Sequence, residues 1–263
     1  TNTNNYDDND MKIIVGIPAR MGSSRFPGKP LCDILGISMI EHCYKRCSLS
    51  KYTTSLFVAA CDKEIQKGVE DFGGAVIMTD PAINRPGLRV AAAAETLGLD
   101  DDDIVVVVQG DEPLVHPDMI DLAVQPLLNE SDVFVSNLMT ELTEQEWNDP
   151  GEIKVVCDLK MNAMYMSRSP IPSVDHEEEL TKWWKQVCIM PFRWHFMKKF
   201  NHELEPTPLE LQESIEMIRA LQHGYKIRMV PSPYISKSVD TEADRKEVEQ
   251  IMKTDKIYKI YCT

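Results

Sequence analysis

The sequence of 263 residues predicts an α/β fold built on a mostly parallel, doubly wound sheet with an antiparallel insertion. Continuous apolar runs such as 11–17 and 104–108 are typical of strands that are covered on both faces. Strands alternate with helices at intervals of roughly 20 to 30 residues, the spacing of right-handed βαβ units. Beyond about Pro150 the alternation gives way to two short runs joined by a turn, which predicts the insertion.

The first half of the chain contains the alternation from which the parallel sheet is predicted. Ser38 and Glu41 have the spacing of a capping box, and Asp62 can cap the helix after the second strand. The Ala-rich run 90–97 is a strong helix former. The predicted strands are 11–17, 55–60, 75–78 and 104–108, and the predicted helices are 38–49, 62–72 and 90–97.

The second half contains the predicted insertion and a long helix. Thr207 and Glu210 form a capping box with Pro208 at the first helical position, and apolar residues recur behind it at helical spacing. The charged segment 173–182 is expected to be an exposed connection. The predicted strands are 153–158, 163–168 and 225–230, and the predicted helices are 208–223 and 244–256.

The composition limits which binding partners and which cellular compartment are expected for this protein. The formal net charge of −14 argues against binding to nucleic acid, which requires a basic face. Seven cysteines without a C-x-x-C pair favour a reducing compartment, and no apolar run has the length of a membrane span. We therefore expect a cytoplasmic protein without membrane insertion. Residues 1–10 are polar and acidic, which predicts a disordered extension before a single domain at 11–255.

One loop, residues 17–31, concentrates basic residues and glycines directly after the first predicted strand. Loops at the carboxyl ends of parallel strands are where open α/β sheets bind ligands, and such a basic loop in an acidic chain predicts a site for a triphosphate. It is not a Walker A loop, because Pro30 follows Lys29 in place of Ser or Thr. Its cations are Arg20, Arg25 and Lys29, and its small residues are Ala19, Gly22, Ser23, Ser24 and Gly28.

Acidic residues are expected on the same edge of the sheet. Asp111 follows Gln109 and Gly110 at the end of the predicted strand 104–108, and a carboxylate beside a triphosphate is suited to Mg²⁺. Asp240, just after another predicted strand, is its candidate partner. For Asp111 the alternative is a turn former, and for Asp240 alone the stronger alternative is a helix cap.

These motifs resemble those of CMP-Kdo synthetases, the 3-deoxy-manno-octulosonate cytidylyltransferases. The resemblance runs in order over residues 11–255, and its motifs are 18–31, 109–113, 154–156, 167–172 and 239–241. It implies a nucleotide-diphospho-sugar transferase fold, a homodimer with a dimerisation insertion at about 150–200, and a role in lipopolysaccharide or surface polysaccharide biosynthesis. It also implies transfer of CMP from CTP to a sugar acid with release of pyrophosphate.

The resemblance implies a role for each matching residue. Charge accumulates on the phosphoryl oxygens and on the leaving group, so the chemistry needs cations and Mg²⁺. The implied catalytic residues are Arg20, Arg25, Lys29 and Asp111, and the implied Mg²⁺ ligands are Asp111 and Asp240. The implied nucleotide-binding residues are Ala19, Arg20, Gly22, Ser23, Arg25, Lys29, Arg85, Arg89, Gln109 and Gly110.

The chain departs from the family in the segments that contact the base and the acceptor. Residues 84–89 retain only a displaced Gly and Arg89 of the family's base-recognition motif. The expected acceptor-binding residues are Arg168, Gln186, Met190 and Glu216; Gln186 and Met190 replace a His and a Tyr, and Met217 replaces a Gln.

Because these polar groups are missing, the sequence allows several candidate acceptors and several candidate nucleotides. The acceptor is an octulosonate-like sugar acid, a modified nonulosonate or octulosonate, or another small anion such as a phosphonate. The nucleotide is CTP, with UTP and dTTP as alternatives. A protein that binds nucleotide without turnover is the alternative from a different class, although the complete set of basic and acidic residues argues against it.

Aromatic residues at 183–184 precede Lys185, and two interpretations of this cluster are open. Aromatic faces can stack on a sugar while a lysine meets its carboxylate. Packing is favoured, because Trp is buried on average. The six histidines show no spacing typical of a zinc site.

Overall fold

The computed structural model describes residues 11–23, 25–173 and 182–262. Ser24, the predicted disordered extension at 1–10 and residues 174–181 of the predicted connection lie outside the described residues. None of the helices in the described ranges is long and apolar enough to cross a membrane.

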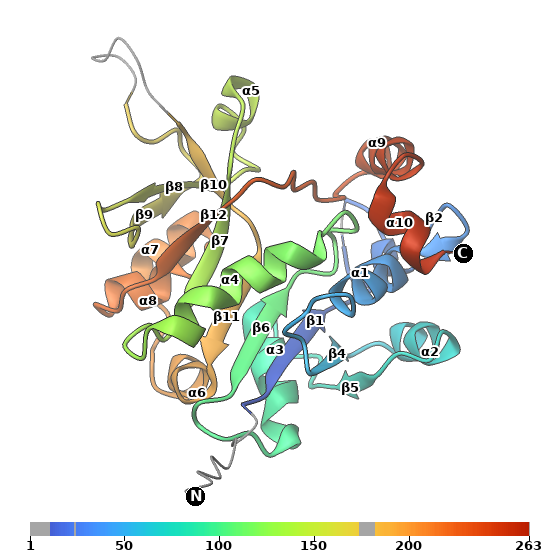
Figure 1. Ribbon diagram of the computed structural model, residues 1–263, viewed down its shortest axis with the longest axis horizontal. Helices are drawn as coiled ribbons and strands as arrows, with labels where there is room; N and C mark the ends of the chain where they lie inside the picture. Colours follow the sequence, from blue (N-terminus) through green and yellow to red (C-terminus); the bar gives the residue numbers. More distant parts are fainter. Residues whose placement is uncertain (1–10, 24, 174–181, 263) are drawn as a thin grey trace, which may run out of the picture.

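A five-stranded sheet with the order β11-β6-β1-β4-β5 forms the centre of the molecule (Figure 1). Four of its strands are parallel, and β11 is antiparallel to β6 at one edge. The predicted α/β class with a mostly parallel sheet is confirmed. The strands are β1 (Ile13–Pro18), β4 (Ser55–Ala60), β5 (Val76–Met78), β6 (Ile104–Val108) and β11 (Ile189–Arg193).

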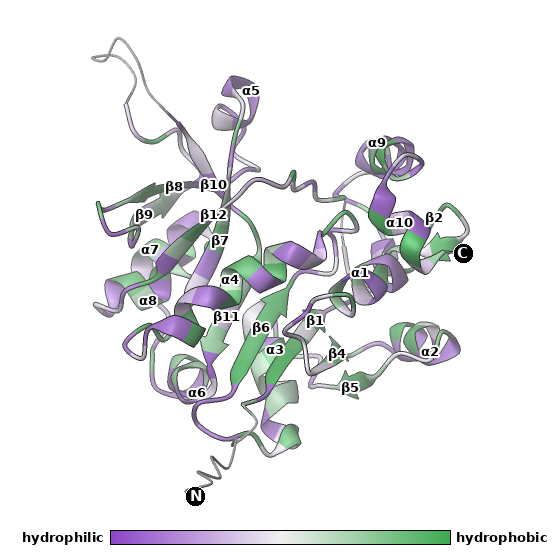
Figure 2. Cartoon of the chain, viewed as in Figure 1, coloured by the Kyte–Doolittle hydropathy of each residue, from purple (hydrophilic) through white to green (hydrophobic). Residues whose placement is uncertain are grey.

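Helices cover both faces of this sheet, and for this reason its central strand β6 is apolar at every position. Val105 and Val107 of β6 pack into one core cluster, and Val106 and Val108 pack into a second cluster on the opposite face. All four valines are buried, and the hydropathy colouring shows β6 as a continuous apolar strand (Figure 2). The covering helices are α1 (Met39–Cys47), α2 (Lys63–Asp71) and α4 (Pro117–Asn129) on one side and α3 (Pro86–Ala94) and α6 (Trp194–His202) on the other.

A second five-stranded sheet with the order β12-β7-β10-β8-β9 contains the predicted insertion. The hairpin of β8 (Lys154–Cys157) and β9 (Ala163–Ser167) is antiparallel, as predicted. The predicted strand 225–230 was misplaced, because β12 (Arg228–Ser232) begins at Arg228 and pairs in parallel with β7. Sequence analysis missed β7 (Ser136–Glu141) and β10 (Trp184–Gln186), which join this hairpin to the rest of the molecule.

Short elements complete the chain. The predicted closing helix is two helices, α9 (Glu242–Met252) and α10 (Lys256–Tyr261), because Asp255 caps α10 and starts a new helix. The other elements are η1 (Lys29–Leu31), β2 (Asp33–Ile34), β3 (Ile37–Ser38), η2 (Glu95–Leu97) and α5 (Glu144–Trp147).

The predicted helix 208–223 is wrong as a single helix. It divides into α7 (Pro208–Glu213) and α8 (Ile218–Gln222), with Ser214 in the left-handed region at φ 54°. The break lets the Glu213 carboxylate accept hydrogen bonds from Tyr165, Ser167 and the Arg168 backbone on the second sheet. Tertiary hydrogen bonds therefore outweigh the helical pattern of the sequence.

A buried ion pair joins the two halves of this broken helix. Arg219 on α8 donates to both carboxylate oxygens of Glu210 on α7, at 2.8 and 2.7 Å, and both side chains are almost completely buried. A buried charge without its partner is strongly destabilising, so each residue of this pair depends on the other.

The last helix packs against α1 through a second buried group. Arg46 on α1 donates to Asp255 and to the Tyr261 hydroxyl. His42, fully buried one turn earlier, donates from Nε2 to the Ile34 carbonyl at 2.7 Å and therefore accepts from Tyr261 at Nδ1. Burial lowers the pKa of His42 to about 4, which keeps its ring neutral.

We predict that Arg219→Met lowers the free energy of unfolding by roughly 3 kcal/mol, because it leaves the Glu210 carboxylate buried and unpaired. Urea denaturation followed by circular dichroism measures the change. The control is Lys67→Met in the exposed Lys67–Asp71 pair, for which a change below about 1 kcal/mol is expected. Equal effects of both variants would contradict the assignment.

We also predict a loss of stability in acid that depends on His42. Its pKa is lower in the folded protein than in the unfolded chain, so its stabilisation is complete above the ordinary value of 6.5 and is lost as the pH falls toward 4. From pH 7 to pH 5 the wild type should lose roughly 2 kcal/mol more than His42→Gln, which does not titrate. Urea denaturation of both proteins at the two pH values tests this, and equal losses would contradict it.

Candidate active site

A cavity of about 350 Å³ opens at the carboxyl ends of β1 and β6. All residues predicted to hold the nucleotide or the metal lie on its wall, together with Pro18, Pro30, Met39, Asn84 and Pro86, which sequence analysis did not single out. The predicted residues on the wall are Ala19, Arg20, Gly22, Ser23, Arg25, Lys29, Arg85, Arg89, Gln109, Gly110, Asp111 and Asp240.

Local hydrogen bonds shape the basic loop. Gly28 has φ 71°, a conformation that favours glycine, and its N–H donates to the Met21 carbonyl across the loop. The Met21 N–H donates to Asp62 Oδ2 at 2.9 Å. Asp62 is the N-cap residue of α2, as predicted, but its side chain makes no capping bond, because its carboxylate accepts from the Met21 N–H in the loop. Ser23 Oγ accepts from the Phe26 N–H inside the same loop.

Gly110 brings the two strand ends together. A Cβ at this position would lie 3.1 Å from the Pro18 carbonyl oxygen and 3.2 Å from Ile17 and Ile40 side-chain atoms, which is tight contact. Absence of a side chain therefore lets the end of β6 approach the end of β1. Asp111, the next residue, is placed beside the basic loop.

Lys29 lies between the two predicted metal ligands. Its Nζ is 3.0 Å from Asp111 Oδ2 and 3.1 Å from Asp240 Oδ1, and Arg25 lies 3.1 Å from the same oxygen of Asp240. Burial alone would lower the pKa of Lys29, but the two carboxylates raise it above its ordinary value, so the ammonium stays charged. Both carboxylates thus face one cation position on the wall of the cavity.

The segment around Asp240 differs from the prediction. It follows no strand, and its position is fixed by the Val239 N–H, which donates to the Asp111 carbonyl at 2.8 Å. The alternative of a helix cap is also wrong, because Thr241 caps α9 through a capping box with Asp244. The Asp240 carboxylate is therefore available to the cavity.

This pair of carboxylates fits Mg²⁺, which keeps several waters and uses one or two carboxylates. In the described part of the chain no group of three or more His, Cys, Asp or Glu side chains is arranged to hold a metal. The donor set therefore suits a cation that also binds phosphate oxygens, and it does not suit zinc.

The cations around the cavity differ in availability. Arg20 is exposed, and its side chain makes no hydrogen bond or ion pair with the described residues. Arg85 makes a long contact of 3.5 Å with Ser214 Oγ. Arg89 is buried and donates to Thr79 Oγ1 and to the Ile83 carbonyl, so its guanidinium also fixes the loop that carries Asn84.

None of the four predicted acceptor-binding residues lies on the wall of this cavity. Met190 and Glu216 line a small neighbouring void together with Gly87, which follows the wall residue Pro86. Gln186 contacts the Met190 sulfur at 3.7 Å. Arg168 is set apart, because its guanidinium donates to the carbonyls of Pro150, Glu213 and Ser214.

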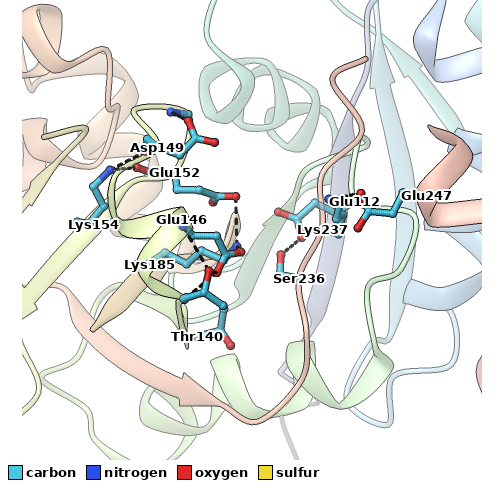
Figure 3. A network of polar contacts seen from close by, with 12 residues as sticks. Glu112, Thr140, Glu146, Asp149, Glu152, Lys154, Lys185, Ser236, Lys237 and Glu247 are labelled. Atoms are coloured by element: carbon cyan, nitrogen blue, oxygen red, sulfur yellow. Dashed lines mark hydrogen bonds and ion pairs between the residues drawn. The ribbon is translucent and has the colours of Figure 1, made fainter. Parts of the chain in front are cut away.

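The aromatic cluster is a packing feature. Trp183 stacks on Trp147 with ring centroids 5.1 Å apart, and Lys185 is buried in ion pairs with Glu146 and Glu152 (Figure 3). Lys185 is therefore already paired. This geometry favours the packing interpretation over sugar stacking.

Across from Lys185 lies Glu112, the residue after Asp111 (Figure 3). Burial raises its pKa to about 7, and it accepts a hydrogen bond from Ser236. Sequence analysis gave Glu112 no role beyond its place in the motif.

Comparisons with known proteins agree with this geometry. The family model for cytidylyltransferases matches residues 14–227. The chain is 40% identical to the 8-amino-3,8-dideoxy-manno-octulosonate cytidylyltransferase of Shewanella woodyi, covering 93% of this chain and 100% of the relative. It is also 40% identical to the 3-deoxy-manno-octulosonate cytidylyltransferase of Syntrophus aciditrophicus, covering 92% and 97%.

A solved structure, described as CMP:2-keto-3-deoxy-manno-octonic acid synthetase complexed with CTP, superposes with a TM-score of 0.86. It is 32% identical and covers 92% of this chain and 98% of its own. The resemblance found in the sequence motifs is confirmed. The chain belongs to the cytidylyltransferase family.

Proposed function

We propose that this protein transfers CMP from CTP to an octulosonate-type sugar acid in a reaction that depends on Mg²⁺. The observation that carries the proposal is that Arg20, Arg25 and Lys29 line the same cavity as Asp111 and Asp240. The anomeric hydroxyl oxygen of the acid forms a bond to the α-phosphorus. The bond from that phosphorus to pyrophosphate breaks, and the hydroxyl proton is released.

The basic residues account for the electrostatics of this step. Both substrates are anionic, so their approach requires screening of negative charge. The guanidinium groups of Arg20 and Arg25 can each donate two hydrogen bonds to phosphate oxygens, whereas the Lys29 ammonium supplies a point charge. Gln109 and Gly110, at the end of β6, border the same cavity and support a role in binding the nucleotide.

Asp111 and Asp240 would hold the Mg²⁺ ion. When bound, it would neutralise charge on the phosphates and polarise the reacting phosphoryl group. The Lys29 ammonium pairs with both carboxylates, which supports a cation position between them. The homodimer and the cytoplasmic location stay predictions.

Release of pyrophosphate from CTP, measured with a panel of sugar acids and phosphonates, tests the proposal. Competition among CTP, UTP and dTTP tests the choice of nucleotide. Tight binding of CTP without release of pyrophosphate from any acceptor would favour the non-catalytic alternative.

We predict that Asp111→Asn abolishes Mg²⁺-dependent release of pyrophosphate and leaves the fold intact, because the amide loses the charge that holds the cation. Pyrophosphate release across a Mg²⁺ titration measures the effect, and the melting temperature reports on folding. Asp71→Asn, on the exposed face of α2, is the matched control and should retain full activity. Unimpaired activity of Asp111→Asn would remove this residue from the metal site.

We further predict that Lys29→Met lowers kcat/KM for CTP by roughly 100-fold, a typical loss for one charge-stabilising group. It removes a phosphate partner and leaves two carboxylates facing the incoming triphosphate. The control is Lys45→Met, which removes an ion pair with Glu41 on α1 outside the cavity. A loss of less than about threefold in kcat/KM for CTP would exclude Lys29 from the triphosphate site.

A further inference from the structure

The part of the chain that carries Asp240 has no regular structure of its own. Residues 233–241, the connecting segment, join β12 to α9 and contain no helix or strand. Asp111 differs, because it follows β6 within three residues and the parallel pairing with β1 places that strand end. The position of the Asp240 carboxylate therefore depends on the contacts that hold the connecting segment.

The two ends of the connecting segment are held by the chain that follows β6. Near its start, the Tyr234 hydroxyl donates to Asp118 Oδ2 at 2.6 Å, and the Tyr234 ring stacks on His116 with centroids 4.0 Å apart. Near its other end, the Val239 N–H donates to the Asp111 carbonyl at 2.8 Å. Residues 235–238 between these contacts need an anchor of their own.

Glu112 supplies an anchor in the middle of the connecting segment. Its Oε2 accepts a hydrogen bond from the Ser236 hydroxyl, four residues before Asp240 (Figure 3). Only 8% of Glu112 is exposed, so water does not readily replace this bond. Glu112 is also the residue after Asp111. One short stretch of chain therefore presents one carboxylate to the cavity and fixes the segment that presents the other.

No ion pair involves Glu112 among the residues that the structure describes. Lys185, the buried lysine across from it, pairs with Glu146 and Glu152 at 2.7 and 3.3 Å. The hydrogen bond to Ser236 is therefore the contact through which Glu112 acts on its surroundings.

We propose that Glu112 is a positioning residue for the metal site, which holds Asp240 through Ser236 at the place where the Asp240 carboxylate faces Asp111. The inference rests on the proposed function, because that function assigns the two aspartates to Mg²⁺. Oxygens of Asp111 and Asp240 lie 3.0 and 3.1 Å from the Lys29 ammonium, so they already share one cation position. A partner that orients a metal-binding carboxylate typically contributes roughly 10- to 100-fold to metal affinity.

Two variants, Glu112→Met and Ser236→Ala, remove this contact from either side. Each should raise the Mg²⁺ concentration that gives half-maximal release of pyrophosphate by roughly tenfold, while KM for CTP at saturating Mg²⁺ stays within about threefold. Relaxation of water protons by Mn²⁺, measured with CTP and without acceptor, reports metal binding in the absence of turnover, and the affinity for Mn²⁺ should fall by a similar factor. The double variant should lose no more than the larger single loss, because both changes remove the same bond.

Glu112→Gln separates positioning from charge. Its amide oxygen still accepts a hydrogen bond from Ser236, so the Mg²⁺ requirement and the Mn²⁺ affinity should stay within about threefold of the wild type. A loss equal to that of Glu112→Met would overturn the inference, because the charge and not the hydrogen bond would then matter. Unchanged Mg²⁺ requirement and Mn²⁺ affinity in Ser236→Ala would overturn it as well.

Two controls leave the contact in place. Tyr234→Phe removes the hydroxyl bond at the start of the connecting segment but keeps the ring, and Thr140 Oγ1 still donates to the carbonyl of this residue at 3.2 Å. Ser48→Ala removes an exposed hydroxyl contact just after α1. Both should keep the wild-type Mg²⁺ requirement. A shift in Tyr234→Phe equal to that in Ser236→Ala would overturn the inference.

Melting temperatures identify any variant that fails to fold. Should Glu112→Met fail to fold, Ser236→Ala and Glu112→Gln still decide the question. A wild type that binds Mn²⁺ but releases no pyrophosphate with any acceptor would overturn the proposed function alone, since Mn²⁺ binding by the variants still decides the inference. A wild type that binds no Mn²⁺ would overturn both.

Discussion

The ion pairs of Lys29 with Asp111 and Asp240 connect three segments on which the rest of the site depends. The lysine belongs to the loop after β1, the first aspartate follows β6, and the second precedes α9. The parallel pairing of β1 with β6 brings the first two together, and the Val239–Asp111 backbone bond adds the third. The sheet therefore brings the ends of its strands to one edge. There the positive charges of Arg25 and Lys29 are balanced by the carboxylates of Asp111 and Asp240.

The cavity at the strand ends is lined by charged side chains and backbone groups, which suit the phosphates that all nucleotides share. Gln186, Met190 and Glu216, the residues that the sequence predicts to contact the acceptor, lie outside this wall. Gln186 donates to Asn137 and contacts the Met190 sulfur, and Glu216 accepts from the Gly87 N–H. The charges suited to phosphate are therefore separated in space from the predicted acceptor residues.

The central sheet and the wall of the nucleotide cavity could be predicted because their signals are local. Runs such as Ile104–Val108 are strands at any position in a chain, and a glycine-rich basic loop needs no distant partner to be recognised. The break at Ser214 and the loop contact of Asp62 could not be predicted. Each depends on a partner far away in sequence, and the local pattern favoured a continuous helix and a helix cap.

The wide separation of Arg25 and Asp240 in the sequence has a consequence for the order in which the site forms during synthesis. These residues form an ion pair across 215 positions, and Asp111 is separated from Lys29 by 82. A ribosome that has made the first half of the chain has produced the basic loop and one carboxylate, and the second carboxylate emerges only with the segment before α9. The ion-pair cluster of Arg25, Lys29, Asp111 and Asp240 therefore forms only after nearly the whole chain has emerged from the ribosome, so a partly made chain holds at most one of the two carboxylates.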